Sequence, residues 1–186
     1  MLPSIRNFRL TCLAFFLIAL PLQSQEKADR DAYEIKAAWL INFIRYVEWP
    51  KPVFPNDRLA IVVLGKEPKA TRFGDQNLNV RGVKIDIIYR TTLTVDDLKN
   101  CHLLFIARSK RKEIKNTLAL VDQRPILTVC ENKGFLTKGG MINFIVKGET
   151  ILFEISQKNA DKNGLRITSH LLARAHFVEK ADGGHR

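Results

Sequence analysis

A run of basic residues is the part of this chain with the clearest capacity for chemistry. Four cations, Arg108, Lys110, Arg111 and Lys112, stand at the start of a helix predicted over residues 109–122. Cations at the positive end of a helix dipole cost about 0.3–1 kcal/mol each before salt screening. We therefore predict that this end meets an anion, such as a phosphate, a lipid headgroup or an acidic partner. The alternative is a solvated run of charge.

The loops that follow the expected strands supply the remaining ligand candidates. In parallel α/β sheets, ligands bind beyond the carboxyl ends of the strands. Gly65 follows the first strand, and Asn132 follows the fourth. The paired Gly139 and Gly140 permit a backbone shape closed to other residues, or a close approach to another surface. They fit equally a tight turn that enters a strand.

The sequence lacks the common motifs for catalysis, cofactor binding and metal binding. The sequence has no G-x-G-x-x-G, no Walker A sequence and no Gly-x-Ser-x-Gly elbow. Cys101 and His102 are adjacent, so in a strand they face opposite ways. His170 and His176 are six residues apart, which is about 240° around a helix. We expect no metal, no cofactor and no enzymatic activity; an enzyme of unrecognised type is the remote alternative.

The cysteines are predicted to remain unpaired within the chain. Cys12 lies in the leader described below, which leaves Cys101 at the beginning of one expected strand and Cys130 at the end of another. If these strands are parallel neighbours, the two sulfurs are roughly 15–20 Å apart. A disulfide requires Cα atoms within about 7 Å. A bond between two chains is the alternative.

The first 24 residues are predicted to be a secretory signal peptide. Arg6 and Arg9 precede an apolar run, residues 10–22, and Ser24 offers a small residue for cleavage. A retained anchor is the alternative. Cleavage near Gln25 leaves 28 basic and 19 acidic residues, a net charge of +9. This charge favours anionic surfaces or acidic partners, and export argues against nucleic acid.

A strongly apolar segment opens the predicted mature chain. Its pattern indicates a helix over residues 30–48 that stops before the Trp49-Pro50 pair. The apolar face is wider than one buried stripe requires, so burial by a second chain and one wide core contact are both consistent with it. We expect one edge of this helix to mediate self-association or partner contact: Asn42, Arg45, Tyr46 and Trp49.

The remaining pattern predicts an α/β fold. Continuous or alternating apolar runs predict strands at residues 59–64, 83–89, 101–107 and 125–130, with short crossovers that include helices near 94–98 and 109–122. Residues 141–146 and 150–155 flank a hairpin turn, and a final helix is expected to contain residues 171–177. The result is a mostly parallel mixed sheet with helices on both faces. Residues 25–180 form one domain, and residues 181–186 are expected to be a disordered tail.

Several of these segments together resemble the YfiR family of periplasmic proteins. The resemblance covers nearly the whole mature chain. It rests on residues 33–50 (Tyr33, Lys36, Ala37, Ala38, Leu40, Asn42, Phe43 and Tyr46-Val47-Glu48-Trp49-Pro50), on Val63-Leu64-Gly65, on residues 101–106 and 126–129, on Gly134-Phe135, on Gly139-Gly140-Met141-Ile142 with Phe144, on Phe153-Glu154-Ile155, and on residues 164–175.

The resemblance implies a dimeric, non-enzymatic periplasmic regulator. The best-understood members restrain an inner-membrane diguanylate cyclase, which makes cyclic di-GMP and controls biofilm formation, and an outer-membrane lipoprotein can sequester them. Their cysteines respond to redox state. The mature form of this chain has two cysteines where those members use more, and only Cys101 sits at a recognisable family position. A periplasmic small-ligand sensor without a cyclase partner is the alternative function.

Overall fold

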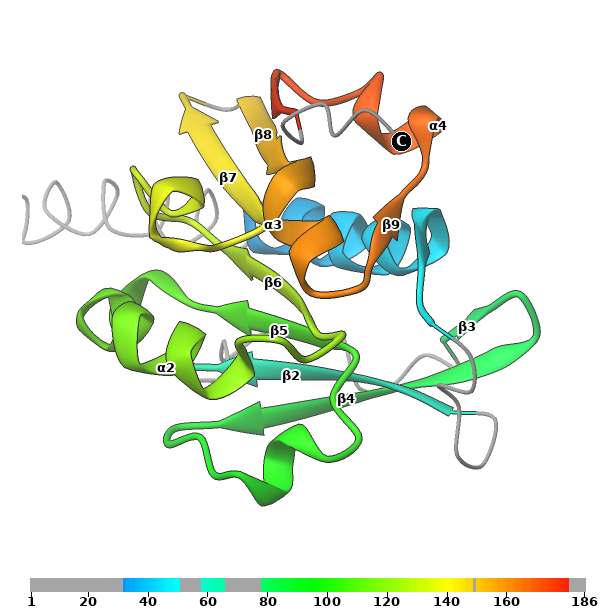
Figure 1. Cartoon of the computed structure of the whole chain (residues 1–186), viewed down its shortest axis with the longest axis vertical. Coiled ribbons are helices and arrows are strands. Elements are labelled where there is room, and N and C mark those ends of the chain that lie inside the picture. Colours follow the sequence, from blue (N-terminus) through cyan, green and yellow to red (C-terminus); the bar gives the residue numbers. More distant parts are fainter. Residues whose placement is uncertain (1–31, 51–57, 66–77, 149, 181–186) are drawn as a thin grey trace, which may run out of the picture.

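The computed structural model describes residues 32–50, 58–65, 78–148 and 150–180. Within them, an eight-stranded sheet has the order β10-β8-β7-β6-β5-β2-β4-β3 (Figure 1). The predicted leader, the link at residues 51–57, the segment at 66–77 and the tail lie outside the described residues. No helix among the described residues is long and apolar enough to cross a membrane.

Three apolar strands form the centre of the sheet. They are β2 (Arg58–Leu64), β5 (Leu103–Ile106) and β6 (Leu127–Cys130), and they run parallel to one another. Every residue in them except Arg58 is buried. This is the arrangement predicted from their uninterrupted apolar runs, because a strand covered on both faces needs apolar side chains in both directions.

The strand beyond β2 lies nearer the edge and is less buried. β4 (Val83–Arg90) runs parallel to β2, and the two-residue β3 (Asn79–Val80) pairs with it antiparallel. On the other side of the centre, β7 (Ile142–Lys147) and β8 (Thr150–Ser156) form the predicted hairpin. The mixed, mostly parallel α/β sheet is thus confirmed.

The final helix is shorter than predicted. The helix α4 covers only Ser169–Leu172, and Phe177 begins a strand, β10 (Phe177–Glu179), parallel to β8. The prediction of a helix through Phe177 is therefore wrong. The backbone N–H of His176 donates to the carbonyl of Phe153 at 2.8 Å, so the open edge of β8 draws this segment into the sheet.

The N-terminal helix covers one face of the sheet. It spans residues 32–46, and the next two residues form β1 (Val47–Glu48), which pairs with β9 (Arg166–Ile167). The helix therefore ends two residues before the predicted boundary. Its buried Phe43 packs with Phe144 and Phe153.

Shorter helices complete the structure. η4 (Arg108–Glu113) and α2 (Ile114–Val121) cover the opposite face, where Ile114 and Leu118 join the second core. The others are η3 (Asp96–Leu98), η5 (Leu136–Lys138) and α3 (Gln157–Lys162).

The prediction that the basic run begins an α-helix is wrong. Residues 108–113 form a 3-10 segment with a kink at Lys110 (φ −100°, ψ 15°), and α2 begins only at Ile114. The N–H of Lys110 bonds to the carbonyl of Ala107, three residues back. Because α2 begins after the basic run, these cations do not stand at the start of its dipole, and any anion site here must depend on the side chains.

Candidate functional site

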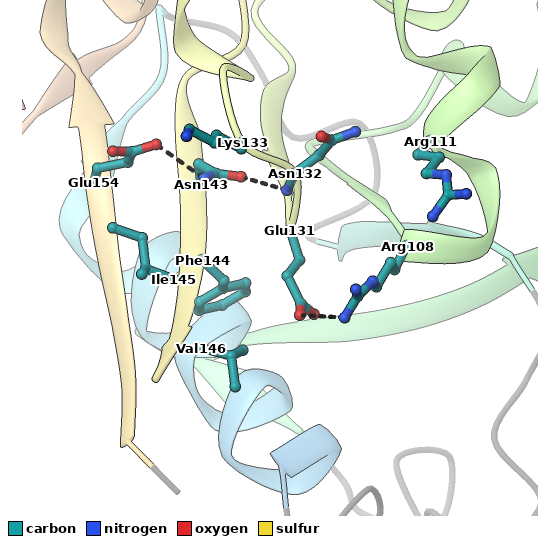
Figure 2. Close-up of a pocket in the computed structure, with 10 residues that line it drawn as sticks. All are labelled: Arg108, Arg111, Glu131, Asn132, Lys133, Asn143, Phe144, Ile145, Val146 and Glu154. Atoms are coloured by element: carbon teal, nitrogen blue, oxygen red, sulfur yellow. Dashed lines mark hydrogen bonds and ion pairs between the residues drawn. The ribbon is translucent and has the colours of Figure 1, made fainter. Parts of the chain in front are cut away.

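A pocket of about 570 Å³ lies at the carboxyl ends of the parallel strands, beside β7 (Figure 2). This is the edge of the sheet at which ligands bind in parallel α/β proteins. The loops after β5 and β6, residues 143–146 of β7 and Glu154 of β8 supply its walls. The lining residues are Arg108, Arg111, Glu131, Asn132, Lys133, Asn143, Phe144, Ile145, Val146 and Glu154.

The pocket exists because β6 ends before β7 does. The two strands pair in parallel only at Val129↔Ile142 and Cys130↔Asn143. β7 continues to Lys147 and stays paired with β8 along its whole length. The space in which a longer β6 would lie is therefore left beside residues 144–146.

The side chain of Asn143 fixes the point at which β6 departs. Its Oδ1 accepts a hydrogen bond from the backbone N–H of Asn132 at 2.8 Å. Its Nδ2 donates to Oε1 of Glu154 at 2.9 Å. Asn143 itself is only 3% exposed, and its two half-buried partners complete the wall of the pocket.

Glu131 lies between two cations at the edge of the pocket. Its carboxylate lies 2.6 Å from Nζ of Lys36 and 3.9 Å from Nη1 of Arg108. The Lys36 and Glu131 side chains are 14% and 17% exposed, so solvent screens this pair less than a surface pair. The bond ties the N-terminal helix to the pocket across 95 residues of sequence.

The pocket keeps an excess of positive charge. Arg108, Arg111 and Lys133 line it with Glu131 and Glu154. Lys36 already neutralises Glu131. Arg108 pairs only weakly with Glu131, because its side chain is 75% exposed and its Nη1 lies 3.9 Å from Oε1 of Glu131. Arg111 and Lys133 make no ion pair with another described residue. The arrangement suits a ligand that carries carboxylate or phosphate groups.

The structure brings some of the predicted site residues together and separates others. Arg108, Arg111 and Asn132 line one pocket. Lys110 instead bonds Glu113 at 2.8 Å, and Lys112 is exposed outside the lining. Gly65, Gly139 and Gly140 also lie outside the lining.

The glycines have visible packing or turn roles. A Cβ on Gly65 would lie 2.6 Å from the Cβ of Ala107, and one on Gly140 would overlap the ring of Phe135. Gly139 ends η5 with a positive φ of 99°. Gly140 thus lies in close contact with Phe135, and a ligand role for the two glycines stays a prediction.

The predicted interface residues lie away from the pocket lining. Arg45 is exposed, and its carbonyl accepts a bond from Nη2 of Arg81 at 2.6 Å. The tilted rings of Tyr46 and His170 have centroids 4.7 Å apart, and Trp49 meets His102 edge-on at 6.3 Å. Asn42 is half-buried. Tyr46 and Trp49 therefore pack partly against the protein's own core. Their role in association remains a prediction.

The other pocket residues were not predicted as ligand residues from the sequence. Asn143 interrupts the apolar run Met141–Val146, and a polar residue at a buried strand position is the signal that could have identified it. Lys36 belongs to the family motif of the first helix. Its partner Glu131 could not be found from spacing alone, because the two residues meet only through the fold.

Both described cysteines are buried free thiols. Cys101 precedes β5, and Cys130 ends β6 at the opposite end of the parallel pair. Burial raises the pKa of each thiol to about 12. Among the described residues, no group of three or more His, Cys, Asp or Glu side chains could hold a metal ion.

Comparison with known families identifies the chain's relatives. The YfiR/HmsC-like family model matches residues 33–176, which include every element that builds the pocket. The chain belongs to the YfiR/HmsC-like family. The members of this family are regulatory, non-catalytic proteins of the periplasm that are linked to cyclic di-GMP signalling.

Other comparisons add little. A crystal structure of a conserved domain protein from Vibrio cholerae O1 biovar eltor is similar to 76% of this YfiR-like chain, at 12% identity and a TM-score of 0.49. The match covers 60% of the length of that protein. No curated protein matches the chain in sequence.

Proposed function

We propose that this YfiR-like protein is a periplasmic regulatory binding protein that restrains an inner-membrane signalling protein through protein–protein contact. A diguanylate cyclase is the proposed target, with cyclic di-GMP and biofilm formation as the output. The observation that carries this proposal is the family match over residues 33–176. The predicted signal peptide and the net charge of +9 of the mature chain agree with export and with an acidic partner.

The proposed assembly is a homodimer that contacts the periplasmic part of its target. The exposed edge of the N-terminal helix, represented by Arg45, is the proposed contact surface, since Arg, Tyr and Trp dominate many protein interfaces. An outer-membrane lipoprotein is a further proposed partner, by analogy with the best-understood members of the family. Arg45→Glu should weaken self-association or capture of the target.

In-cell crosslinking of the tagged protein, followed by mass spectrometry of the captured envelope proteins, tests the regulator proposal. Recovery of an inner-membrane protein with a cyclase or kinase output domain supports it. Deletion of the gene should then raise cyclic di-GMP, and the full-length chain should restore the lower level. A chain without residues 1–24 should not restore it. Recovery of self-linked dimers alone, with unchanged cyclic di-GMP, would contradict the proposal.

A small-ligand sensor is the second candidate, and the pocket favours it specifically. The pocket volume of about 570 Å³ lies within the range of small-molecule sites. Thermal stabilisation by members of a library of anionic metabolites would support this function. The two functions are compatible, since a ligand that binds two conformations unequally shifts the affinity for a partner.

A further inference from the structure

Residues 144–146 of β7 form an unpaired strand edge in the middle of the sheet. On one side, all six residues of β7 pair with β8, from Ile142↔Ile155 to Lys147↔Thr150. On the other side, β6 accompanies only Ile142 and Asn143. Residues 144–146 border the pocket instead (Figure 2).

The ladder registers show which backbone groups point into the pocket. Lys147 and Thr150 close a two-residue hairpin loop, so the hydrogen-bonded pairs with β8 are those of Lys147, Ile145 and Asn143. The alternate residues, Phe144 and Val146, therefore direct their backbone groups toward β6. The parallel register Cys130↔Asn143 lets the N–H of Phe144 reach the carbonyl of Cys130. The carbonyl of Phe144 and both backbone groups of Val146 have no strand partner among the described residues.

The edge is kept open by a specific side chain. In a continued ladder, the N–H of Asn132 would bond to the carbonyl of Phe144. It bonds to Oδ1 of Asn143 at 2.8 Å instead. The side chain of Asn143 thus takes the place of the next ladder acceptor, and the chain after β6 turns out of the sheet.

The surroundings of this edge define the chemistry of an occupant. Arg108, Arg111 and Lys133 line the pocket, and the two arginines lie across it from β7 (Figure 2). The two carboxylates already have partners in Lys36 and the amide of Asn143. Val146 is apolar and 40% exposed at the rim. An extended strand that carries carboxylates and small apolar side chains complements both the backbone groups and the charges.

We propose that this pocket is a strand-addition site that takes a short, extended, acidic segment of a protein partner beside β7. Backbone hydrogen bonds to Phe144 and Val146 give affinity, and the cations select acidic side chains, as in other cases of strand addition. Only the identity of the partner rests on the proposed regulatory function. The binding chemistry belongs to the site itself.

The test uses the mature chain and a synthetic peptide of alternating Val and Glu residues, acetylated and amidated at its ends. Binding is measured by fluorescence anisotropy, and amide hydrogen exchange is followed residue by residue. We expect saturable binding that weakens as salt is added. The N–H of Val146 should become protected, whereas that of Phe144, which is already paired with β6, should change little.

Charge variants separate the site from a general effect of charge. Arg108→Gln with Arg111→Gln should weaken peptide binding about fivefold or more, because two charged contacts are lost. Lys84→Gln with Lys115→Gln removes the same charge from exposed positions outside the pocket and should leave binding nearly unchanged. A peptide of alternating Val and Lys should bind poorly to the unchanged chain.

The outcomes distinguish this inference from the proposed function. No binding of the acidic peptide, or binding without protection of Val146, overturns strand addition. If inorganic phosphate displaces the labelled peptide as well as unlabelled peptide does, the pocket is a small-anion site, and strand addition is again overturned. Peptide binding in a chain that captures no membrane protein from the envelope supports the site but contradicts the regulator proposal. Capture of the partner that survives loss of Arg108 and Arg111 places the regulatory contact elsewhere and overturns the use of this site by that partner.

Discussion

The side-chain oxygen of Asn143 lies 2.8 Å from the backbone nitrogen of Asn132 and ends the pairing of β6 with β7. The amide of the same side chain bonds Glu154 at 2.9 Å. One buried side chain thereby joins three segments: the loop after β6, β7 and β8. It also determines where the pocket begins.

Asn143→Ala should destabilise the protein by about 1–3 kcal/mol, because a partly buried N–H loses its acceptor and Glu154 loses a donor. Urea unfolding at neutral pH measures this change. Asn143→Asp keeps an acceptor but places a second carboxylate beside Glu154, so its deficit should shrink as the pH is lowered. An alanine variant as stable as the original chain would show that water replaces the side chain at no cost.

Gly140→Ala should cost about 1–3 kcal/mol of stability, because a Cβ there overlaps the fully buried ring of Phe135. Thermal unfolding followed by circular dichroism measures the loss. Gly139→Asn is the matched control: nothing lies within 4 Å of a Cβ at this position, and Asn tolerates the positive φ of 99°. Equal losses in the two variants would contradict the packing role of Gly140.

Cys101 and Cys130 should resist alkylation by iodoacetamide at pH 8 while the protein is folded. Burial raises the pKa of each thiol to about 12. At pH 8, about one thiol in ten thousand is then ionised, and the thiolate is the reactive species. Mass spectrometry before and after unfolding in urea provides the measurement. Rapid labelling of the folded chain, or a disulfide-linked dimer on a non-reducing gel, would count against buried, unpaired thiols.

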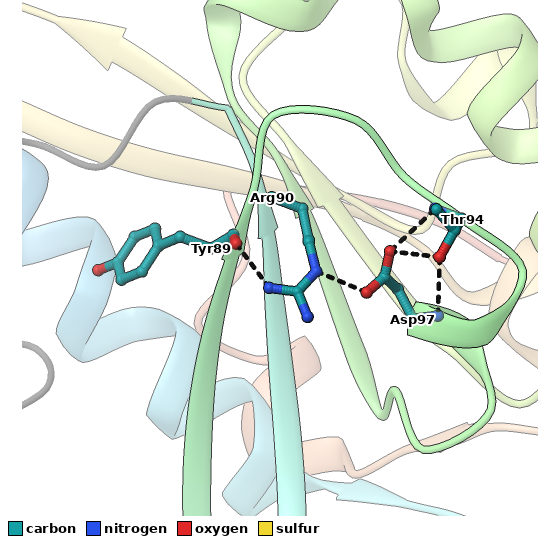
Figure 3. A network of polar contacts seen from close by, with 4 residues as sticks. All are labelled: Tyr89, Arg90, Thr94 and Asp97. Atoms are coloured by element: carbon teal, nitrogen blue, oxygen red, sulfur yellow. Dashed lines mark hydrogen bonds and ion pairs between the residues drawn. The ribbon is translucent and has the colours of Figure 1, made fainter.

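Asp97 should stabilise the loop after β4 in a pH-dependent way. Its carboxylate accepts bonds from the N–H and hydroxyl of Thr94 at 2.9 and 2.7 Å and from Nε of Arg90 at 2.6 Å (Figure 3). The N–H of Asp97 bonds back to the hydroxyl of Thr94 at 3.3 Å. The bonds from Thr94, followed by those from Arg90, lower the pKa of Asp97 to about 2.

A lowered pKa means that folding favours the ionised form of Asp97. The stabilisation is complete above about pH 4, where the carboxyl is ionised in the unfolded chain too, and is lost as the pH falls through about 2. Asp97→Asn should therefore be less stable than the original chain at pH 7, and the difference should disappear near pH 2. Urea unfolding at a series of pH values measures this. A difference that does not depend on pH would exclude ionisation of Asp97 as its cause.

The sequence determined the centre of the fold and the family. An apolar run such as Leu59–Leu64 between polar segments is stable only if both of its faces are covered, so the parallel strands could be located without the structure. The hairpin around Gly148 followed from local turn chemistry. These features depend on residues close together in the chain, which is the range over which a sequence pattern carries information.

The tertiary structure decided which candidate residues meet in one pocket and how the last described residues join the sheet. Phe177 begins β10 because the edge of β8 is available for pairing, and no local sequence pattern predicts that this edge is free. Lys36 meets Glu131 across 95 residues, and the difference in length between β6 and β7 appears only when the two strands are aligned. The site depends on strand register and on contacts between distant segments, and these are set by the packing of the whole sheet rather than by the propensity of any one segment.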